Sequence, residues 1–264
     1  MLSDIEFRIL LDHLDRPWKG FRKVRKGVKK RLRRHMQAMG CSTVDRYILR
    51  LSNDPAARSA CEGCLGVTIS RFFRDRRLWQ ALHDRFLPDL VGRFGSPIRV
   101  WSAGCAGGEE PYSLAILWKR LAPGATLDLL ATDADDRCLE RARAGVYTPS
   151  SLKEVPGDIR ESYFATGKGG RRLHLHRHRL PEVRWRRHDL FDPPPEPGPF
   201  HLVLMRNNLL TYYRGERLKD AFARIVRVLA PGGCLATGSH ERLQEDAWPL
   251  DRDADCPWVY RRKG

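Results

Sequence analysis

Apolar residues recur at two different periods along the chain, and the change of period predicts two domains. Through the first 88 residues, apolar positions lie three or four apart, as they do on one face of a helix. The clearest run consists of Phe21, Val24, Val28, Leu32 and Met36. Ser42 or Thr43, and Asp54, precede further helical stretches as candidate N-caps. We therefore expect a helical N-terminal domain over residues 1–88.

From residue 97 onward, short apolar runs alternate with amphipathic stretches. The predicted strands are residues 98–103, 127–132, 200–205, 233–237 and 258–262, and the predicted helices between them are 111–121, 135–144 and 216–229. This alternation is typical of a parallel sheet with helices on both faces. Residues 172–178 and 183–187 alternate polar and apolar positions, and we interpret them as a small antiparallel β insert at about 163–187. The second domain, 89–264, is thus expected to be α/β.

A glycine-rich turn follows the first predicted strand directly. Gly104 begins it, and Gly107 and Gly108 lead into Glu109 and Glu110. Glycines at this position let a ligand approach the backbone closely. The two carboxylates would repel a pyrophosphate, and neither G-x-G-x-x-G nor a P-loop is present. The pattern favours a cationic ligand such as S-adenosylmethionine, whose sulfonium and α-ammonium groups a carboxylate stabilises.

Two aspartates follow other predicted strands. Asp133 ends the second strand, where a carboxylate can accept both hydroxyls of a ribose. The alternative role for Asp133 is the N-cap of the next helix, which Asp135 could fill equally well. Asp189, in the segment 188–191, follows another strand candidate and is expected to hold the adenine together with a backbone amide. These residues complete a candidate nucleoside site.

The net charge of +16 comes from 48 Lys and Arg against 32 Asp and Glu. Eleven of these cations lie between Arg16 and Arg34, where no acidic residue occurs. A field of this sign attracts nucleic acid, an anionic membrane face or an acidic protein helix alike. A solvated surface helix is the plainer interpretation of the same run, but dense cations repel one another unless a counter-charge is near.

Composition narrows the class of protein further. No window holds the roughly 18 consecutive apolar residues of a membrane span, and the first residues lack a secretion signal, so we expect a cytoplasmic protein. Seven cysteines, an odd number, are expected to be reduced thiols. Cys61 and Cys64 form a Cys-x-x-Cys pair, but no second pair of soft ligands lies nearby, so we predict no metal site.

Several segments together resemble the CheR-type methyltransferases, which methylate glutamate side chains on chemotaxis receptors. In the family's order, the matching segments are residues 67–75, 101–113, 131–135, 145–147, 163–164, 206–207 and 231–241. The Gly-Glu-Glu-Pro-Tyr-Ser block within 101–113 is the most specific of them. The resemblance implies a Rossmann-like class I methyltransferase domain with a helical N-terminal domain and a small β subdomain. It also implies S-adenosyl-L-methionine as the cofactor and S-adenosyl-L-homocysteine as the product.

The resemblance also implies a set of site residues. Ser70 and Arg74 are expected to reach the cofactor and the substrate, Glu109 to bind the amino acid portion, and Asp133 the ribose. The full set of expected cofactor-binding residues is Ser70, Arg74, Gly104, Glu109, Asp133, Asp189, Leu190, Asn207 and Asn208.

Arg74 and Tyr212 are the predicted catalytic residues. A glutamate acceptor is already ionised near neutral pH, so the enzyme has mainly to position and desolvate it, and a guanidinium that grips one carboxylate oxygen does this. The alternative for Arg74 is a surface arginine at the start of a helix. Tyr212 stands one residue after the position of a family tyrosine, which Thr211 occupies here. The alternative for Tyr212 is a ring packed in the core.

Two further segments depart from the family pattern. The usual Gly-His-Ser-Glu is altered to Gly-Ser-His-Glu at 238–241, and the usual asparagine before Phe72 is missing from the segment 68–70. These changes are expected to lie around the substrate rather than around the cofactor. They weaken the assignment of a chemotaxis receptor as substrate more than that of a methyltransferase.

The favoured function is therefore methylation of a carboxylate on a protein. The cationic helix 16–34 would dock an acidic partner, such as a helical receptor or signalling protein. Methylation of a small molecule is a second possibility. Nucleic-acid methylation is less favoured because an Asn-Pro-Pro-Tyr-like motif and an aromatic base platform are absent. A non-catalytic cofactor-binding interaction module is the fourth, and the retained Arg74, Glu109 and Asp133 argue against it.

Overall fold

A computed structural model describes residues 2–121, 124–167, 169–243 and 247–264. The chain forms two compact units, one of Met1–Thr68 with Leu210–Leu218 and one of Ile69–Leu209 with Lys219–Gly264. The division falls near residue 68, whereas the sequence pattern predicts a boundary near residue 88. The difference arises because the helices over 76–94 bury their apolar face in the core of the second unit.

The first unit is helical, as predicted. Its helices are α1 (Asp4–His13), α2 (Trp18–Phe21), α3 (Arg25–Ala38), α4 (Val44–Asn53) and α5 (Pro55–Leu65). Thr43 and Asp54 cap α4 and α5 through their side chains, which confirms Asp54 and selects Thr43 over Ser42. The predicted helix across 16–36 is divided in two, and its apolar stripe still enters the core through Phe21, Val28, Leu32 and Met36.

A segment from late in the chain completes this unit. The ring of Tyr212 packs against Phe21 with ring centroids 5.0 Å apart. Arg214 forms an ion pair of 2.9 Å with Asp12, and Arg217 lies 3.6 Å from Glu62. The segment begins in α11 (Leu209–Tyr212) and runs into the first turn of α12 (Gly215–Arg227). The helical unit is therefore discontinuous in sequence.

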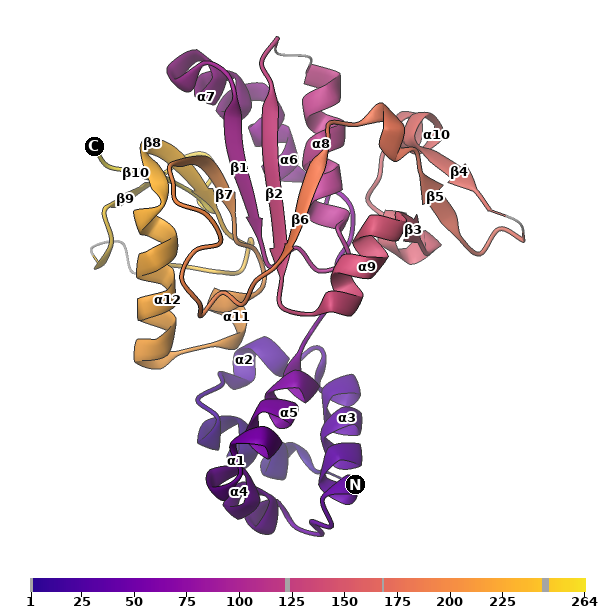
Figure 1. Cartoon of the computed structure of the whole chain (residues 1–264), viewed down its shortest axis with the longest axis vertical. Helices are drawn as coiled ribbons and strands as arrows, with labels where there is room; N and C mark the ends of the chain where they lie inside the picture. Colours follow the sequence, from indigo (N-terminus) through magenta and orange to yellow (C-terminus); the bar gives the residue numbers. More distant parts are fainter. Residues whose placement is uncertain (1, 122–123, 168, 244–246) are drawn as a thin grey trace. The chain divides into compact units, whose positions relative to one another are not determined.

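The second unit is built on a seven-stranded sheet with the order β6-β2-β1-β7-β8-β10-β9 (Figure 1). Its strands are β1 (Ile98–Ala103), β2 (Leu127–Asp133), β6 (Val183–Arg187), β7 (Phe200–Leu204), β8 (Leu229–Ala236), β9 (Leu250–Arg252) and β10 (Val259–Arg262). β10 pairs antiparallel with β8 and β9, and the other pairs are parallel. The chain passes from β1 to β2 on one side and returns to β7 on the other, so the sheet has a switch point beside β1. Ligands bind at such points in open α/β sheets.

Helices accompany the sheet as the alternating pattern predicts. They are α6 (Arg76–Ala81), the π-helical turn η1 (Leu82–Phe86), α7 (Leu87–Phe94), α8 (Glu109–Leu121), α9 (Asp136–Ala144), the 3-10 turn η2 (Pro149–Leu152), α10 (Gly157–Tyr163) and most of α12. α8 and α9 pack beside β2 and β6 (Figure 1). The architecture is Rossmann-like, which confirms the predicted fold class. No helix among the described residues is long and apolar enough to cross a membrane.

The small antiparallel sheet exists, but its strands differ from those predicted. It consists of β3 (Val146–Tyr147), β5 (Leu173–Leu175) and β4 (Phe164–Thr166), with β5 in the middle and the 3-10 turn η3 (Arg177–Arg179) after it. The predicted insert also included 183–187, which is instead the edge strand β6, parallel to β2. Val183 packs into the main core while Arg184 is exposed, so an edge strand shows the same alternation as a hairpin arm. Lys168, within the predicted insert, lies outside the described residues.

Burial of the α3 stripe should hold the first unit together. Leu32 is fully buried, whereas Leu49 on α4 is 65% exposed. Leu32→Ala should lower the free energy of unfolding by about 2–5 kcal/mol because it leaves a cavity. Leu49→Ala, the same change on the surface, should alter it by less than about 0.5 kcal/mol. Urea titration followed by circular dichroism measures both, and equal effects would contradict the packing described.

Candidate functional site

The glycine turn lies between β1 and α8, at the switch point of the sheet. The backbone N–H groups of Gly104 and Cys105 donate to the carbonyl of Thr132, at 2.9 and 2.8 Å, and so join the ends of β1 and β2. Gly104 has φ of +78°, and a Cβ there would lie 2.4 Å from Nδ2 of Asn208. A side chain at this position would strain the backbone and require the Asn208 amide to move. The backbone of the turn at Gly104 thus lies directly against the side-chain amide of Asn208.

Asp133 faces this turn from the end of β2. Its Oδ2 accepts from the N–H of Ala106 at 2.8 Å, and its Oδ1 accepts from the N–H of Asp135 at 3.0 Å. The N-cap of α9 is Asp135, whose side chain accepts from Arg137 N–H. The capping role is thus filled by Asp135. Burial raises the pKa of Asp133, and the backbone donors oppose the rise.

Glu109 opens α8 and is almost completely buried, with 2% of its surface exposed. Its Oε1 lies 3.5 Å from Nη2 of Arg141 and accepts from Oγ of Ser151 at 3.4 Å. Its buried Oε2 has no hydrogen-bond partner among the described residues. Burial raises the pKa of Glu109, while Arg141 opposes the rise. A buried carboxylate oxygen without a donor matches the α-ammonium of S-adenosylmethionine, so the residues fit this cofactor.

The segment after β6 is joined to the same place. The N–H of His188 donates to the carbonyl of Asp133 at 3.0 Å, which brings Asp189 and Leu190 to the end of β2. Asp189 is exposed and its Oδ1 accepts from the N–H of Phe191, while Leu190 is half-buried. The two residues lie beside the ribose-binding candidate, where an adenine site is expected.

Asn207 and Asn208 follow β7 and approach the turn from the other side. Nδ2 of Asn208 donates to the carbonyl of Ala103 at 2.5 Å. Asn207 has φ of +55°, and its N–H donates to Oε2 of Glu241 at 2.9 Å. The carboxyl ends of β1, β2, β6 and β7 thus each contribute a predicted cofactor residue or lead directly into one.

Arg74 lies in a constrained turn before α6. Phe73 and Asp75, on either side of it, both have left-handed backbone conformations, with φ of +52° and +66°. The carbonyl of Arg74 accepts from Nε1 of Trp79 at 2.8 Å. Among the described residues, the Arg74 guanidinium has no hydrogen-bond or ion-pair partner. Its side chain is therefore available for a ligand, unlike those of most buried or half-buried arginines in this unit.

Two further predicted residues are Ser70 and Tyr212. Ser70 is half-buried, two residues before Phe72 enters the core of the second unit. Tyr212 belongs to the first unit, where its ring packs against Phe21. The half-buried ring is packed, as the packed-ring alternative expects, and the predicted catalytic role of Tyr212 stays a prediction.

Sequence reasoning missed Arg141 and Ser151, which contact Glu109. Both come from segments with no motif of their own, and Arg141 in particular has the spacing of an ordinary surface cation on a helix. It also missed Glu110 as a group distinct from Glu109: Oε1 of Glu110 accepts from Oγ of Ser102 at 2.7 Å inside the sheet. The only signal for this division was that two adjacent helical carboxylates must point in different directions.

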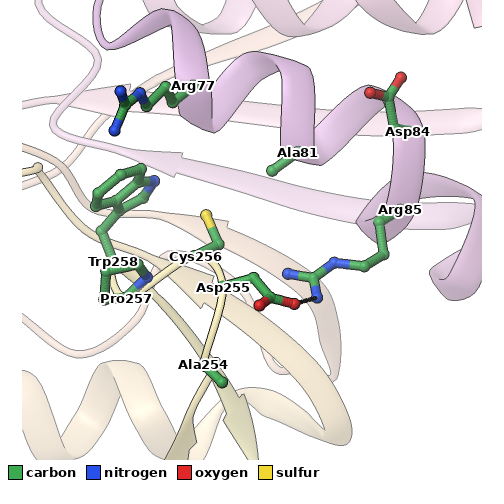
Figure 2. A pocket seen from close by; sticks show the side chains of 9 residues that line it. All are labelled: Arg77, Ala81, Asp84, Arg85, Ala254, Asp255, Cys256, Pro257 and Trp258. Atoms are coloured by element: carbon green, nitrogen blue, oxygen red, sulfur yellow. Dashed lines mark hydrogen bonds and ion pairs between the residues drawn. The ribbon is translucent and has the colours of Figure 1, made fainter.

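A separate pocket of about 580 Å³ lies between the α6–η1 helix and the loop before β10 (Figure 2). Arg77 and Trp258 lie at one end of it, and Arg85 pairs with Asp255 at the other. The remaining lining residues are Ala81, Asp84, Ala254, Cys256 and Pro257. None of these is a predicted site residue, so the pocket is distinct from the glycine-turn site.

The unpartnered oxygen of Glu109 gives a direct test of the cofactor site. Glu109→Gln keeps the shape of the side chain and removes its charge, so the affinity for S-adenosylmethionine should fall about 10- to 100-fold. Glu140→Gln makes the same change on the exposed face of α9 and should leave the affinity within about twofold. Isothermal titration calorimetry measures both. Wild-type affinity in Glu109→Gln would exclude Glu109 as a ligand.

The pH dependence of binding separates charge from shape with the same pair of variants. Because burial raises the pKa of Glu109, its ionised form is lost at a higher pH than that of an exposed glutamate. Affinity should therefore fall as the pH drops through this raised pKa, and Glu109→Gln should show a flatter profile. A profile unchanged in midpoint and amplitude would assign the titration to another group, such as Asp133.

Known proteins of one family resemble this chain over most of its length. The profile of the family described as "CheR methyltransferase, SAM binding domain" matches residues 68–252. The chain is 34% identical over 205 residues to a "Chemotaxis protein methyltransferase" of Listeria monocytogenes, covering 78% of this chain and 77% of that protein. It is 31% identical over 224 residues to the protein of the same name from Salmonella typhimurium, covering 82% and 75%.

The match spans the glycine turn, Asp133, the segment after β6 and the turn that contains Arg74. It therefore covers every residue of the second unit that the sequence assigned to the cofactor. The family, the sheet order and the buried carboxylates agree, and the chain belongs to the CheR family of S-adenosylmethionine-dependent methyltransferases.

Proposed function

We propose that this protein methylates a carboxylate side chain, that of glutamate, on an acidic protein partner. The observation that carries the proposal is the Arg74 guanidinium, which has no partner among the described residues and lies within the segment that matches the family. The names of the relatives, chemotaxis protein methyltransferases, support a protein acceptor of the receptor type. That the acceptor of this protein is a receptor is likewise proposed.

Methyl transfer to a carboxylate needs no acid–base catalyst. S-adenosylmethionine, when bound, supplies a methyl group on a sulfonium; transfer forms a C–O bond, breaks the C–S bond and leaves S-adenosylhomocysteine. The acceptor carboxylate is ionised at neutral pH, with a reference pKa of about 4.3, so no proton has to move. The residues have instead to orient the acceptor and exclude water.

Arg74 is the residue to which we assign this orientation. A guanidinium binds one carboxylate oxygen by a charge-assisted hydrogen bond and leaves the other oxygen to react. Glu109 and Asp133 would hold the amino acid and ribose portions of the cofactor, with Asp189, Leu190 and Asn208 around the nucleoside. The scheme gives Tyr212 no separate role; its ring is half-buried against the core of the first unit, and its predicted catalytic role stays a prediction.

The cationic surface of the first unit is the proposed docking surface for the acceptor. Arg25 and Lys29 pair with Asp4, but other cations of this stretch are exposed and have no ion-pair partner among the described residues. They are Lys19, Arg22, Lys23, Lys26, Lys30, Arg33 and Arg34. Unpaired cations at this density favour an acidic partner. We place the reaction in the cytoplasm, in keeping with seven cysteines that are all free thiols.

The acceptor chemistry can be tested without knowing the acceptor. Purified protein is incubated with tritium-labelled S-adenosylmethionine and an extract of the source organism that lacks the gene. A carboxyl methyl ester releases its label as volatile methanol under mild alkali. Label in protein that resists alkali would contradict the ester, and label confined to small molecules or nucleic acid would move the acceptor to those classes. Failure to bind S-adenosylmethionine at millimolar concentration would favour a non-catalytic module.

Arg74→Ala should reduce the methanol-releasing activity at least about 100-fold, because the acceptor loses its orientation. Arg77→Ala removes an exposed arginine three residues away, which lines the separate pocket, and should leave kcat/KM within about twofold. Arg74→Lys keeps the charge without the planar fork and should recover only part of the activity. Equal activity in the two alanine variants would rule out the assigned role of Arg74.

Charge reversal tests the docking surface. Lys30→Glu with Arg33→Glu should raise KM for the protein acceptor about tenfold or more at low salt, with little change in kcat, because docking precedes chemistry. Arg46→Glu with Arg50→Glu reverses two exposed charges on α4 of the same unit and serves as the control. The difference between the pairs should shrink at high ionic strength. If both pairs raise KM equally, net charge and not the α3 surface governs docking.

A further inference from the structure

A chain of buried and half-buried charged side chains lies beside the glycine-turn site and includes none of its predicted ligands. Arg206, with a side chain only 3% exposed, is its centre. Nη2 of Arg206 lies 2.8 Å from Oδ2 of Asp75, and Nη1 lies 3.2 Å from Oε2 of Glu110. Both ends are held in turn: Oδ1 of Asp75 accepts from Oγ of Ser239 at 3.1 Å, and Oε1 of Glu110 accepts from Oγ of Ser102.

Each member of this chain is the immediate neighbour of a site residue. Asp75 follows Arg74, Glu110 follows Glu109, and Arg206 precedes Asn207. The three segments come from the turn before α6, the first turn of α8 and the end of β7. One guanidinium thus ties together three otherwise separate pieces of backbone, each of which presents a side chain assigned to cofactor or substrate.

The backbone is held most closely around Arg74. Nη2 of Arg206 also donates to the carbonyl of Arg74 at 2.7 Å, where Nε1 of Trp79 donates as well. Phe73, one residue earlier, donates its N–H to Oγ of Ser113 at 2.9 Å and buries its ring against Trp79. The backbone on both sides of Arg74 is therefore fixed, although its own guanidinium has no partner among the described residues.

Stability alone does not account for this arrangement. Left-handed conformations at two non-glycine residues are unfavourable and persist only where the surroundings impose them. Burial raises the pKa of Glu110, and its contact with Arg206 opposes the rise. A buried ion pair is in general no more stabilising than well-packed apolar groups. Strain and buried charge are instead concentrated on the turn that carries the proposed substrate-binding arginine.

We infer that Arg206 is a positioning residue, which acts through the Asp75–Arg206–Glu110 chain to hold Arg74 in the orientation needed for the acceptor and the cofactor. This rests on the role proposed for Arg74. Lysine cannot replace arginine here, because a single ammonium cannot reach the Arg74 carbonyl, Asp75 and Glu110 with a planar fork. Ser239 contacts only Asp75 among these charged residues, so it should contribute more weakly to the position of Arg74.

The test is a double-mutant cycle between positions 206 and 74, with affinity for S-adenosylhomocysteine and methyl transfer as separate measurements. Arg206→Lys should weaken S-adenosylhomocysteine binding about 5- to 10-fold and lower kcat/KM about 10- to 100-fold in the wild-type background. In the Arg74→Ala background it should change either quantity less than twofold. If the fold-losses caused by the two substitutions multiply in the double variant, the two residues act independently and the inference is wrong.

A matched control removes general loss of structure as an explanation. Arg261 is more exposed than Arg206, at 32%, but it likewise pairs with an aspartate, Asp89, at 2.8 Å and donates to a backbone carbonyl, that of Gly232. Arg261→Lys should therefore leave binding and transfer within about twofold. Hydrogen exchange of the peptide spanning 70–80 should speed up in Arg206→Lys and not in Arg261→Lys. Unchanged exchange in Arg206→Lys would also overturn the inference.

A milder variant keeps the test decisive if Arg206→Lys is poorly folded. Ser239→Ala removes one hydrogen bond to Asp75 and should lower kcat/KM about 2- to 5-fold in the wild-type background alone. If no carboxyl methylation is found in any background, the proposed acceptor is wrong, while the binding cycle and the exchange data still decide whether Arg206 positions Arg74. If methylation is found and Arg206→Lys matches wild type, only the positioning inference fails.

Discussion

The arrangement of the second unit depends on two adjacent carboxylates that α8 buries in its first turn. An ionised carboxylate at the N-terminus of a helix is favoured by the helix dipole, but burial alone would make it unstable. Glu110 finds its counter-charge in Arg206 and its hydrogen bond in Ser102, inside the sheet. Glu109 finds only the partial counter-charge of Arg141 and keeps one oxygen without a donor among the described residues. Glu110 is thus held entirely by contacts within the protein, whereas Glu109 keeps one oxygen available to a ligand.

The strands and helices of the second unit were predictable to the extent that short-range pattern decides them. β1 coincides with its predicted bounds because an apolar run leads straight into a glycine turn. β6 was assigned to the wrong sheet, since an edge strand with one buried face alternates as a hairpin does, and its pairing with β2 is a long-range choice. The break between α2 and α3 interrupts a regular apolar stripe, so the stripe predicted the buried residues better than the helix ends.

The site followed the same rule. Gly104, Glu109 and Asp133 lie in segments whose local sequence shows their chemistry, and the structure gathers all three at the switch point. Arg141 and Ser151 could not be found in this way, because their contact with Glu109 depends on how α9 and the η2 turn pack. The αL conformations beside Arg74 were equally hidden, since neither Phe73 nor Asp75 is glycine. The local sequence therefore predicts the side chains that bind a ligand, but not the contacts that hold those side chains in their orientation.

The excursion of residues 210–218 into the first unit bears on how the protein is made. The aromatic packing of Tyr212 on Phe21 and the ion pairs of Arg214 and Arg217 all complete helices synthesised some 150 to 200 residues earlier. Chains usually fold in order of synthesis, domain by domain. Here the N-terminal unit reaches its final form only after most of the sheet of the other unit has left the ribosome. A fragment that ends at Thr68 would lack those contacts, so the boundary between the two units is a boundary in space and not in the order of assembly.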